Sequence, residues 1–177
     1  MSTLSRISLL AVCVLLLQGA VGARERGDPA TPKVTGPQEV DVVAVMLDPR
    51  TQQPVVIMEG RRDKRSLTMA IGLAEANGIA VPLQGVKPPR PLTHDLIMTL
   101  FERLHVSLKR VVITDVRDDI YYALVTLGAT GSEMTLDARP SDAIALAIRA
   151  KVPVLVEDRV FDKAGGGAVE PGTRERI

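Results

Sequence analysis

The chain has 177 residues, of which 22 are basic and 21 acidic, and it contains two tyrosines, two phenylalanines and one cysteine. A net charge of +1 lacks the surplus of positive charge that marks strongly basic nucleic-acid-binding domains, and so few aromatic side chains offer little for base stacking. Composition alone therefore does not indicate a nucleic-acid-binding protein.

The N-terminus has the order of a secretory signal, in which a basic start is followed by an apolar run and small residues. Arg6 precedes the almost uncharged residues 7–22, and the run ends at Ala23. We expect residues 1–23 to be a cleaved signal peptide, so that the protein is exported to the periplasm or beyond the cell. The run of about 16 residues could also stay in place as an uncleaved N-terminal anchor.

Cys13, the single cysteine, lies inside this run, so we expect no disulfide, thiol nucleophile or thiolate metal site in the mature chain. We also expect no stable membrane span there.

The remaining residues, about 154, suit a single domain with one core. Proline, glycine, threonine and charged residues predict a disordered leader over 24–38, and glycines predict a flexible tail over 161–177. The domain is then expected at 39–160.

The first half of this domain begins with β-branched runs that predict strands at 39–48 and 54–60, with a third short strand within 61–69. Residues 70–83 favour a helix by their alanine and leucine content. Gly72, Asn77 and Gly78 weaken that helix, and Pro82 is expected to stop it. A proline-rich connector follows.

The next helix is predicted from Thr93, as N-cap, to about Val106. Leu92 and Ile97 suit a hydrophobic staple at its start. The apolar residues of this segment are expected to form a single stripe, made by Leu96, Ile97, Leu100, Phe101 and Leu104.

The second half predicts a β-hairpin whose strands, 108–116 and 120–129, flank the turn residues 117–119. A further strand at 132–138, a largely buried helix at 142–151 and a last strand at 152–158 follow. These elements predict an α+β fold with a mixed β-sheet packed with about three helices, as a single compact domain after the signal sequence.

Two segments resemble each other: "RPLTHDLIMTL", residues 90–100, and "RPSDAIALAI", residues 139–148. In each, an Arg-Pro pair and a hydroxyl residue precede an aspartate in the first turn of a predicted helix. The helix dipole alone would stabilise Asp95 and Asp142 there by about 0.3–1 kcal/mol. Alternatively, the two carboxylates converge, bind a divalent cation and activate water, as metal-assisted phosphodiester cleavage requires. Arg90 and Arg139 suit phosphate contacts.

His94 and Glu75 each allow a structural and a functional interpretation. His94 is either a surface residue of a first helical turn or a proton-transfer group, because imidazole titrates near neutrality. Glu75 is the only charge between Arg65 and Lys87. On a largely buried helix it needs a partner, so it either forms a salt bridge to an arginine such as Arg139 or Arg149, or belongs to a site.

A basic cluster lies beside the third predicted strand and is interrupted by Asp63. It is either a solvated loop or the best local candidate for phosphate contact. Its members are Arg61, Arg62, Lys64 and Arg65.

Four segments together resemble the bifunctional nuclease domain family of bacterial and plant proteins: "AIGLAEANGIA", "VKPPRPLTHDLI", "DIYYALVTL" and "DARPSDAIALAIRAKVPVLVED". The resemblance runs from about residue 40 to 158. It implies an α+β domain that pairs into a homodimer and acts as a nuclease on DNA and RNA. The positions that match the family's motifs are Gly72, Glu75, Pro91, Thr93, His94, Asp95, Arg139, Ser141, Asp142 and Ala143. Two departures concern Glu75, because Thr68 stands where members usually have proline, and Gly78 and Pro82 are expected to shorten the helix.

The leading hypothesis is an exported, homodimeric nuclease that hydrolyses phosphodiester bonds of DNA and RNA, with Mg²⁺ or Mn²⁺ as candidate cofactor. The expected roles are catalysis by His94, Asp95, Asp142 and Glu75, substrate binding by Arg90, Arg139 and Ser141, and metal binding by Asp95 and Asp142. The rival is a non-catalytic dimeric binding or scaffold module whose polar motifs are helix caps and buried ion pairs. A third hypothesis is a small anionic ligand at the two helix N-termini.

Overall fold

The computed structural model describes residues 35–129 and 131–164, which contain seven strands in one sheet and four helices. The signal peptide or anchor expected at 1–23, most of the leader and the tail from residue 165 lie outside the described residues. The predicted α+β class and mixed sheet are confirmed, with one helix more than expected.

The sheet has the strand order β3-β2-β1-β7-β4-β5-β6, and every neighbouring pair is antiparallel except β4 and β7. Val, Ile and Leu dominate its central strands, as expected for strands buried against helices. The strand bounds are β1 Gln38–Leu47, β2 Pro54–Gly60, β3 Ser66–Ala70, β4 Val106–Arg117, β5 Ile120–Ala129, β6 Ser132–Ala138 and β7 Val154–Val156.

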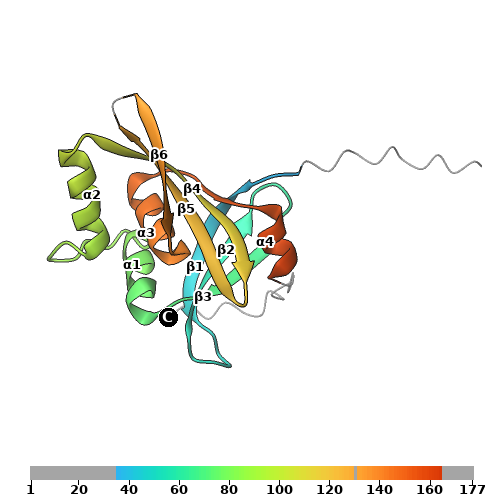
Figure 1. The fold of residues 1–177 in the computed structure, drawn as a ribbon. Helices are drawn as coiled ribbons and strands as arrows, with labels where there is room; N and C mark the ends of the chain where they lie inside the picture. The colour runs from blue at the N-terminus through green and yellow to red at the C-terminus, as the bar shows by residue number, and fades with distance from the viewer. Residues whose placement is uncertain (1–34, 130, 165–177) are drawn as a thin grey trace, which may run out of the picture. The chain divides into compact units, whose positions relative to one another are not determined.

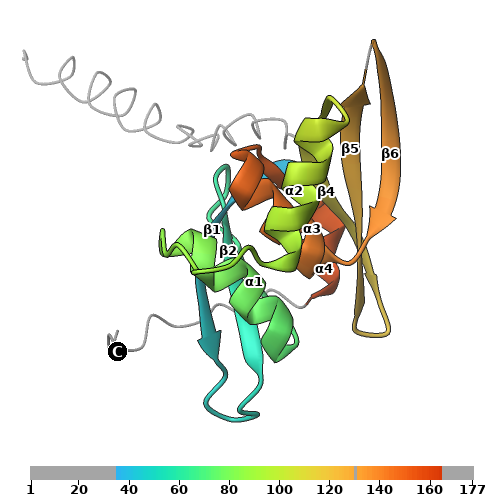
Figure 2. The ribbon, with the colours of Figure 1, turned by 90° about the vertical axis from the view of Figure 1, so that its left-hand side faces the viewer.

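Helices α1, α2 and α3 lie together on one face of the sheet, whereas α4 lies on the other side of it (Figures 1 and 2). Their bounds are α1 Leu73–Leu83, α2 Thr93–Arg103, α3 Pro140–Ala150 and α4 Asp158–Lys163. The middle of α3 is buried from Ala143 to Ala147, and its alanines allow neighbouring elements to pack closely. The predicted burial of this helix is therefore confirmed.

Helix α1 continues through Gly78 and includes Pro82, and it ends one residue later at Leu83, which is also the end of the predicted segment. Proline has no N–H to donate to the carbonyl four residues earlier. That carbonyl belongs to Gly78, and it accepts a hydrogen bond from Arg149 Nη1 at 2.7 Å instead. The side chain of another helix thus satisfies the group that the proline leaves unpaired.

Helix α2 begins at Thr93 with Leu92 as its N-cap residue, one position earlier than predicted, and ends at Arg103. Its apolar residues also do not form one stripe. Ile97 and Phe101 pack against the core, whereas an outer row of leucines is exposed. The exposed fractions are 65% for Leu96, 53% for Leu100 and 61% for Leu104.

The predicted hairpin is confirmed, because β4 and β5 pair across a two-residue turn. Asp118 and Asp119 both have positive φ, 48° and 61°. Such angles are those of the tight turns whose twist matches paired strands, and aspartate tolerates them better than most residues.

Both expected boundaries of the domain differ from those of the structure. Gln38, assigned to the leader, is a buried residue of β1. The boundary at residue 160 falls inside α4, where Phe161 is only 2% exposed. The guanidinium of Arg65 lies 4.5 Å from the centre of the Phe161 ring and also pairs with Asp158. Residues 161–163 therefore belong to the folded domain and not to a tail.

Within residues 35–129 and 131–164, no helix has the length and apolar character needed to cross a membrane.

Candidate active site

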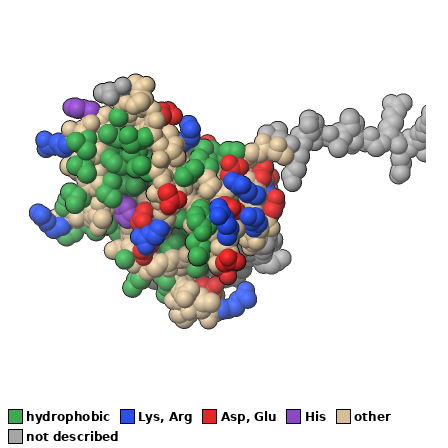
Figure 3. All heavy atoms as spheres, in the orientation of Figure 1, with side chains coloured by type: hydrophobic (Ala, Val, Ile, Leu, Met, Phe, Trp, Pro, Cys, Tyr) green, Lys and Arg blue, Asp and Glu red, His purple; other side chains and the backbone are tan. Residues whose placement is uncertain are grey.

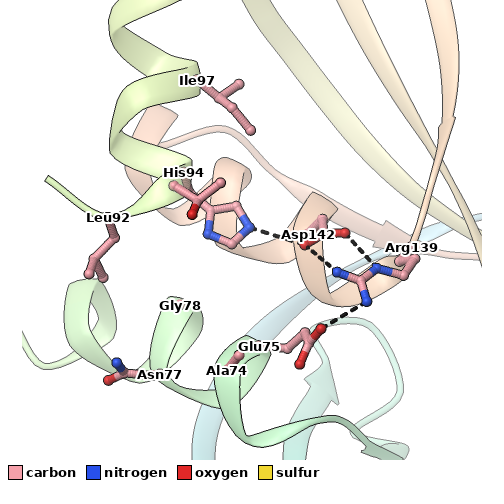
Figure 4. Close-up of a pocket in the computed structure, with 10 residues that line it drawn as sticks. Ala74, Glu75, Asn77, Gly78, Leu92, His94, Ile97, Arg139 and Asp142 are labelled. Carbon is pink, nitrogen blue, oxygen red and sulfur yellow. Dashed lines mark hydrogen bonds and ion pairs between the residues drawn. The ribbon is translucent and has the colours of Figure 1, made fainter.

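Four polar residues from three helices surround one pocket between α1, α2 and the start of α3 (Figure 4). Glu75 lies in the first turn of α1, His94 and Asp142 in the first turns of α2 and α3, and Arg139 at the N-cap of α3. We call these four residues the quartet. The pocket has a volume of about 460 Å³. Its other lining residues are Ala74, Asn77, Gly78, Leu92, Thr93 and Ile97.

The quartet forms one continuous chain of hydrogen bonds and ion pairs, drawn as dashed lines in Figure 4. His94 Nε2 lies 3.2 Å from Asp142 Oδ1. Arg139 donates to both oxygens of Asp142, from Nε at 2.8 Å and from Nη2 at 3.2 Å. Its Nη1 donates to Glu75 Oε1 at 2.8 Å. Of the two alternatives for Glu75, the salt bridge to an arginine is present, with Arg139 as the partner.

The members of the quartet differ in how far they reach solvent. The side chain of Arg139 is 65% exposed, that of Asp142 33% and that of Glu75 20%. His94 is buried, with 8% of the residue exposed. The interpretation of His94 as a surface residue was wrong, and the pocket has a deep imidazole and a guanidinium at its mouth.

The pairing fixes the charge of Asp142. Burial alone would raise the pKa of this carboxyl, but hydrogen bonds from Arg139 and His94 outweigh it and hold the pKa below its usual range. In return, the hydrogen bond to Asp142 raises the pKa of Arg139. Asp142 is thus an anion at neutral pH, and it can orient the imidazole and stabilise a positive charge on it.

Gly78 provides the space that His94 occupies. A Cβ atom at Gly78 would lie 2.9 Å from His94 Cε1 and 3.1 Å from Nδ1, closer than carbon and nitrogen atoms normally approach. The imidazole therefore packs where α1 has no side chain. From the sequence, Gly78 was expected only to weaken the helix, because a contact between residues 16 positions apart gives no local signal.

Asp95 lies at the same position of α2 as Asp142 in α3, but it points elsewhere. It accepts hydrogen bonds from the Leu92 N–H at 2.8 Å and from Arg149 Nε at 2.6 Å. Arg149 has a side chain only 8% exposed and also donates to Gly78 and Ala145 carbonyls. Burial would raise the pKa of Asp95, but its hydrogen bonds from Arg149 and Leu92 hold it low. Asp95 does not line the pocket.

The donor set of the quartet does not match a metal site as it stands. Among the described residues, no group of three or more His, Cys, Asp or Glu side chains is arranged to hold a metal ion. Asp95 and Asp142 have no common partner in this part of the chain, and the Arg139 guanidinium joins Glu75 to Asp142. A cation shared by those two carboxylates would have to displace it.

Two further predicted substrate-binding residues lie outside this pocket. Ser141 is buried, 7% exposed, and lines a second pocket next to the quartet. Arg90 is exposed on the connector before α2, where it makes no side-chain hydrogen bond or ion pair to residues that the structure describes.

The basic cluster between β2 and β3 is electrically compensated, which Figure 3 shows as blue and red side chains mixed on one side of the molecule. Every one of its members pairs with a carboxylate, so the cluster holds neighbouring segments together and does not present an uncompensated positive surface. The pairs are Arg61 with Glu39 and Asp41, Arg62 with Asp158, Lys64 with Glu59, and Arg65 with Asp63, Asp158 and Asp162.

Comparisons with known proteins agree on one family. A family model described as "Bifunctional nuclease domain" matches residues 55–167. An uncharacterized protein of Mycobacterium tuberculosis is 42% identical over 127 residues, which cover 72% of this chain and 76% of that protein. "Bifunctional nuclease 1" of Oryza sativa is 32% identical over 125 residues, covering 69% of this chain but 34% of the plant protein. "Bifunctional nuclease 1" of Arabidopsis thaliana is 23% identical over 124 residues, covering 67% of this chain and 38% of that protein. The matched region thus spans about a third of the plant proteins.

Proposed function

The chain belongs to the bifunctional nuclease domain family, and we propose that it is a nuclease that hydrolyses phosphodiester bonds of DNA and RNA in the pocket of the quartet. The observation that carries this proposal is the buried His94 held by an ionised Asp142 beside an exposed arginine. A proton-transfer group, its orienting carboxylate and a phosphate-binding cation then occur together in one pocket.

Arg139 is the proposed phosphate ligand. Its side chain is 65% exposed, and its planar fork of donors matches two phosphate oxygens. In the structure those donors bind Asp142 and Glu75, so substrate binding requires the guanidinium to exchange at least one carboxylate for the phosphate. Arg139 makes one hydrogen bond to Glu75 but two to Asp142, so the Glu75 contact is the one more easily given up.

His94 is the proposed proton-transfer group. When Nε2–H donates to Asp142, the lone pair lies on Nδ1, on the side of the ring that faces α1 (Figure 4). Nδ1 would accept a proton from the attacking water as the new P–O bond forms. The bond between phosphorus and the sugar oxygen breaks, and the imidazolium returns the proton to that oxygen. Asp142 stabilises the transient imidazolium.

The candidate cofactors Mg²⁺ and Mn²⁺ have no step in this proposal, because Arg139 holds the carboxylates that would bind them. Asp95, expected to share that metal, is proposed instead to anchor α2 to Arg149. Whether cleavage depends on a metal ion is tested by comparing the activity in Mg²⁺, Mn²⁺ and EDTA.

We also propose that the protein is a homodimer that is exported by residues 1–23. The outer row of α2, defined above as Leu96, Leu100 and Leu104, supports self-association, because three exposed leucines on one helix face are unusual for a monomer. The apolar residues Met134 and Leu136 of the edge strand β6 are also exposed, at 51% and 46%. Figure 3 shows a continuous apolar area on this side. Leu100→Lys should give a monomer in analytical ultracentrifugation, whereas Val43→Lys on β1 should not.

The activity is tested with labelled single-stranded DNA, double-stranded DNA and RNA. The chain from Arg24 is assayed in Mg²⁺, Mn²⁺ or EDTA beside His94→Gln. We expect cleavage by the wild-type protein and at least a hundredfold loss in His94→Gln, with an unchanged melting temperature. Equal inactivity of both folded proteins would favour the rival, a binding module in which the quartet is only an ion-pair network.

A further inference from the structure

A second pocket adjoins the first and shares two members of the quartet with it. Glu75 and Arg139 line both, so their ion pair lies on the boundary between the two cavities. The second pocket has a volume of about 400 Å³, within the range of about 300–1,000 Å³ typical of sites for small ligands. Its remaining walls come from the loop after β3, the β4–β5 hairpin and the start of α3.

The walls of the second pocket are mixed in a way that suits a nucleobase. Ile71, Ile120 and Tyr121 provide apolar and aromatic surface. Ile120 is 59% exposed at the hairpin, so its side chain is accessible to a ligand in this pocket. A flat ring laid against such side chains would bury both surfaces, and base stacking on aromatic groups is tolerant of sequence.

Polar groups complete the pocket. Ser141 is 7% exposed, and its hydroxyl makes no hydrogen bond to any residue in the part of the chain that the structure describes. Burial, together with the charge of Asp119, raises the pKa of Tyr121, so its hydroxyl stays protonated and can donate. The carboxylate of Asp119 disfavours a phosphate at the hairpin end of this pocket, and the carboxylates of Asp119 and Glu75 can accept hydrogen bonds from a base.

On these grounds we propose that the second pocket is a subsite for the base of a nucleotide next to the cleaved bond. This inference rests on the proposed nuclease function and assigns it a substrate contact. A phosphate at Arg139 would lie at the boundary of the two pockets, so the nucleotide joined to it on one side reaches the wall made by Ile120 and Ser141.

The test uses a six-nucleotide single strand in which only the central linkage is a phosphodiester and the others are uncharged methylphosphonates. Two analogues lack the base on the 5′ or on the 3′ side of that linkage. The kcat/KM for each substrate is measured with the wild-type protein, with Ile120→Ser and with the control Val43→Ser. Val43 is 57% exposed and lies in neither pocket, so the control matches the change in size and polarity.

For the intact strand we expect Ile120→Ser to lose about tenfold in kcat/KM and Val43→Ser less than twofold. Loss of one of the two bases should lower the wild-type kcat/KM about tenfold. With that analogue, Ile120→Ser should lower kcat/KM less than twofold further, because the base and the Ile120 side chain form one interaction.

Any one of four outcomes would overturn the subsite. If Ile120→Ser and Val43→Ser behave alike, or if the two losses multiply for both analogues, the base lies elsewhere, and the proposed nuclease function is untouched. If the wild-type protein cleaves the longer substrates described above but not this strand, the subsite is again wrong. If it cleaves no nucleic acid at all, the proposed function fails and the subsite with it.

Discussion

His94 lies deeper in the protein than its place in the first turn of a helix suggests, because Gly78 leaves room for the imidazole. The ring is held on one edge by Asp142 and against α1 on the other. At the scale of single residues, the site therefore depends as much on an absent side chain as on the groups that carry charge.

Gly78→Ala should have opposite effects on the stability of α1 and on the position of the His94 ring. Alanine improves helix propensity by about 1 kcal/mol, yet its methyl group would displace a ring that Asp142 must orient. We expect kcat to fall at least about tenfold, since small misplacements of catalytic groups have large effects. The imidazole NMR signals of His94 should shift as well.

The matched control is Gly128→Ala on β5, where a Cβ would meet chiefly the flexible end of Lys109. An unchanged kcat in Gly78→Ala, with unchanged imidazole signals, would show that the close contact does not position the ring.

At the scale of elements, one buried arginine connects three helices. Arg149 of α3 binds Asp95 of α2 and the Gly78 carbonyl of α1, the group that Pro82 leaves without a donor. The two Arg-Pro segments are similar in sequence, but their aspartates differ in role, since Asp142 faces the pocket and Asp95 faces this arginine.

Asp95→Asn should therefore affect stability more than catalysis. We expect a loss of about 2 kcal/mol in the free energy of unfolding, below the 3–5 kcal/mol typical of breaking a buried pair, because Asp95 is 34% exposed. The kcat should stay within threefold. Urea unfolding and cleavage assays check both, with Glu102→Gln on the exposed side of α2 as control. A hundredfold loss of kcat at unchanged stability would instead make Asp95 catalytic.

Local patterns predicted most elements but not their surroundings. The β4–β5 hairpin and buried α3 follow from turn residues and alanine-rich periodicity, which are properties of neighbouring positions. The six-residue α4 is too short for a periodic signal. It is held by contacts such as the bond from Arg65 to Asp158, two residues that are 93 positions apart in the sequence. Likewise, nothing in the sequence of α2 distinguishes its partly buried apolar residues from its exposed leucines.

Four members of the candidate site were predictable from the sequence, but their contacts were not. Three other predicted site residues, Arg90, Asp95 and Ser141, do not line this pocket. Motif positions identified Glu75, His94, Arg139 and Asp142, and the structure brings these four together. The sequence could not predict that Asp95 and Asp142 have different partners, because both occupy the same position of a first helical turn. Only the neighbours contributed by other helices decide where each carboxylate points.

At the scale of the whole molecule, paired carboxylates tie the described elements together, and their pKa values are held low. The clearest case is Asp115, whose pKa is lowered by hydrogen bonds from Lys163 and Arg117; the bond from Lys163 also links β4 to α4. The other lowered carboxyls are Asp41, Asp63, Asp95, Asp142 and Asp158.

This charge pattern predicts acid sensitivity with a definite sign. A carboxyl whose pKa is lower in the folded state than its unfolded value, about 3.9, stabilises the fold above that pH. The contribution is lost as pH falls through the folded values, so the melting temperature should drop below about pH 4. Thermal melts from pH 7 to 2 at fixed salt check this. Asp115→Asn should show a shallower decline, and a melting temperature that rises on acidification would contradict the prediction.

The quartet is the proposed active site of a nuclease. The most direct measurement compares kcat/KM for oligonucleotide cleavage by the wild-type protein, Asp142→Asn and the control Asp137→Asn, which replaces an exposed carboxylate on β6. We predict at least a hundredfold loss for Asp142→Asn, because the neutral amide no longer stabilises the imidazolium, and less than twofold for the control. Equal activity of all three folded proteins would contradict the claim.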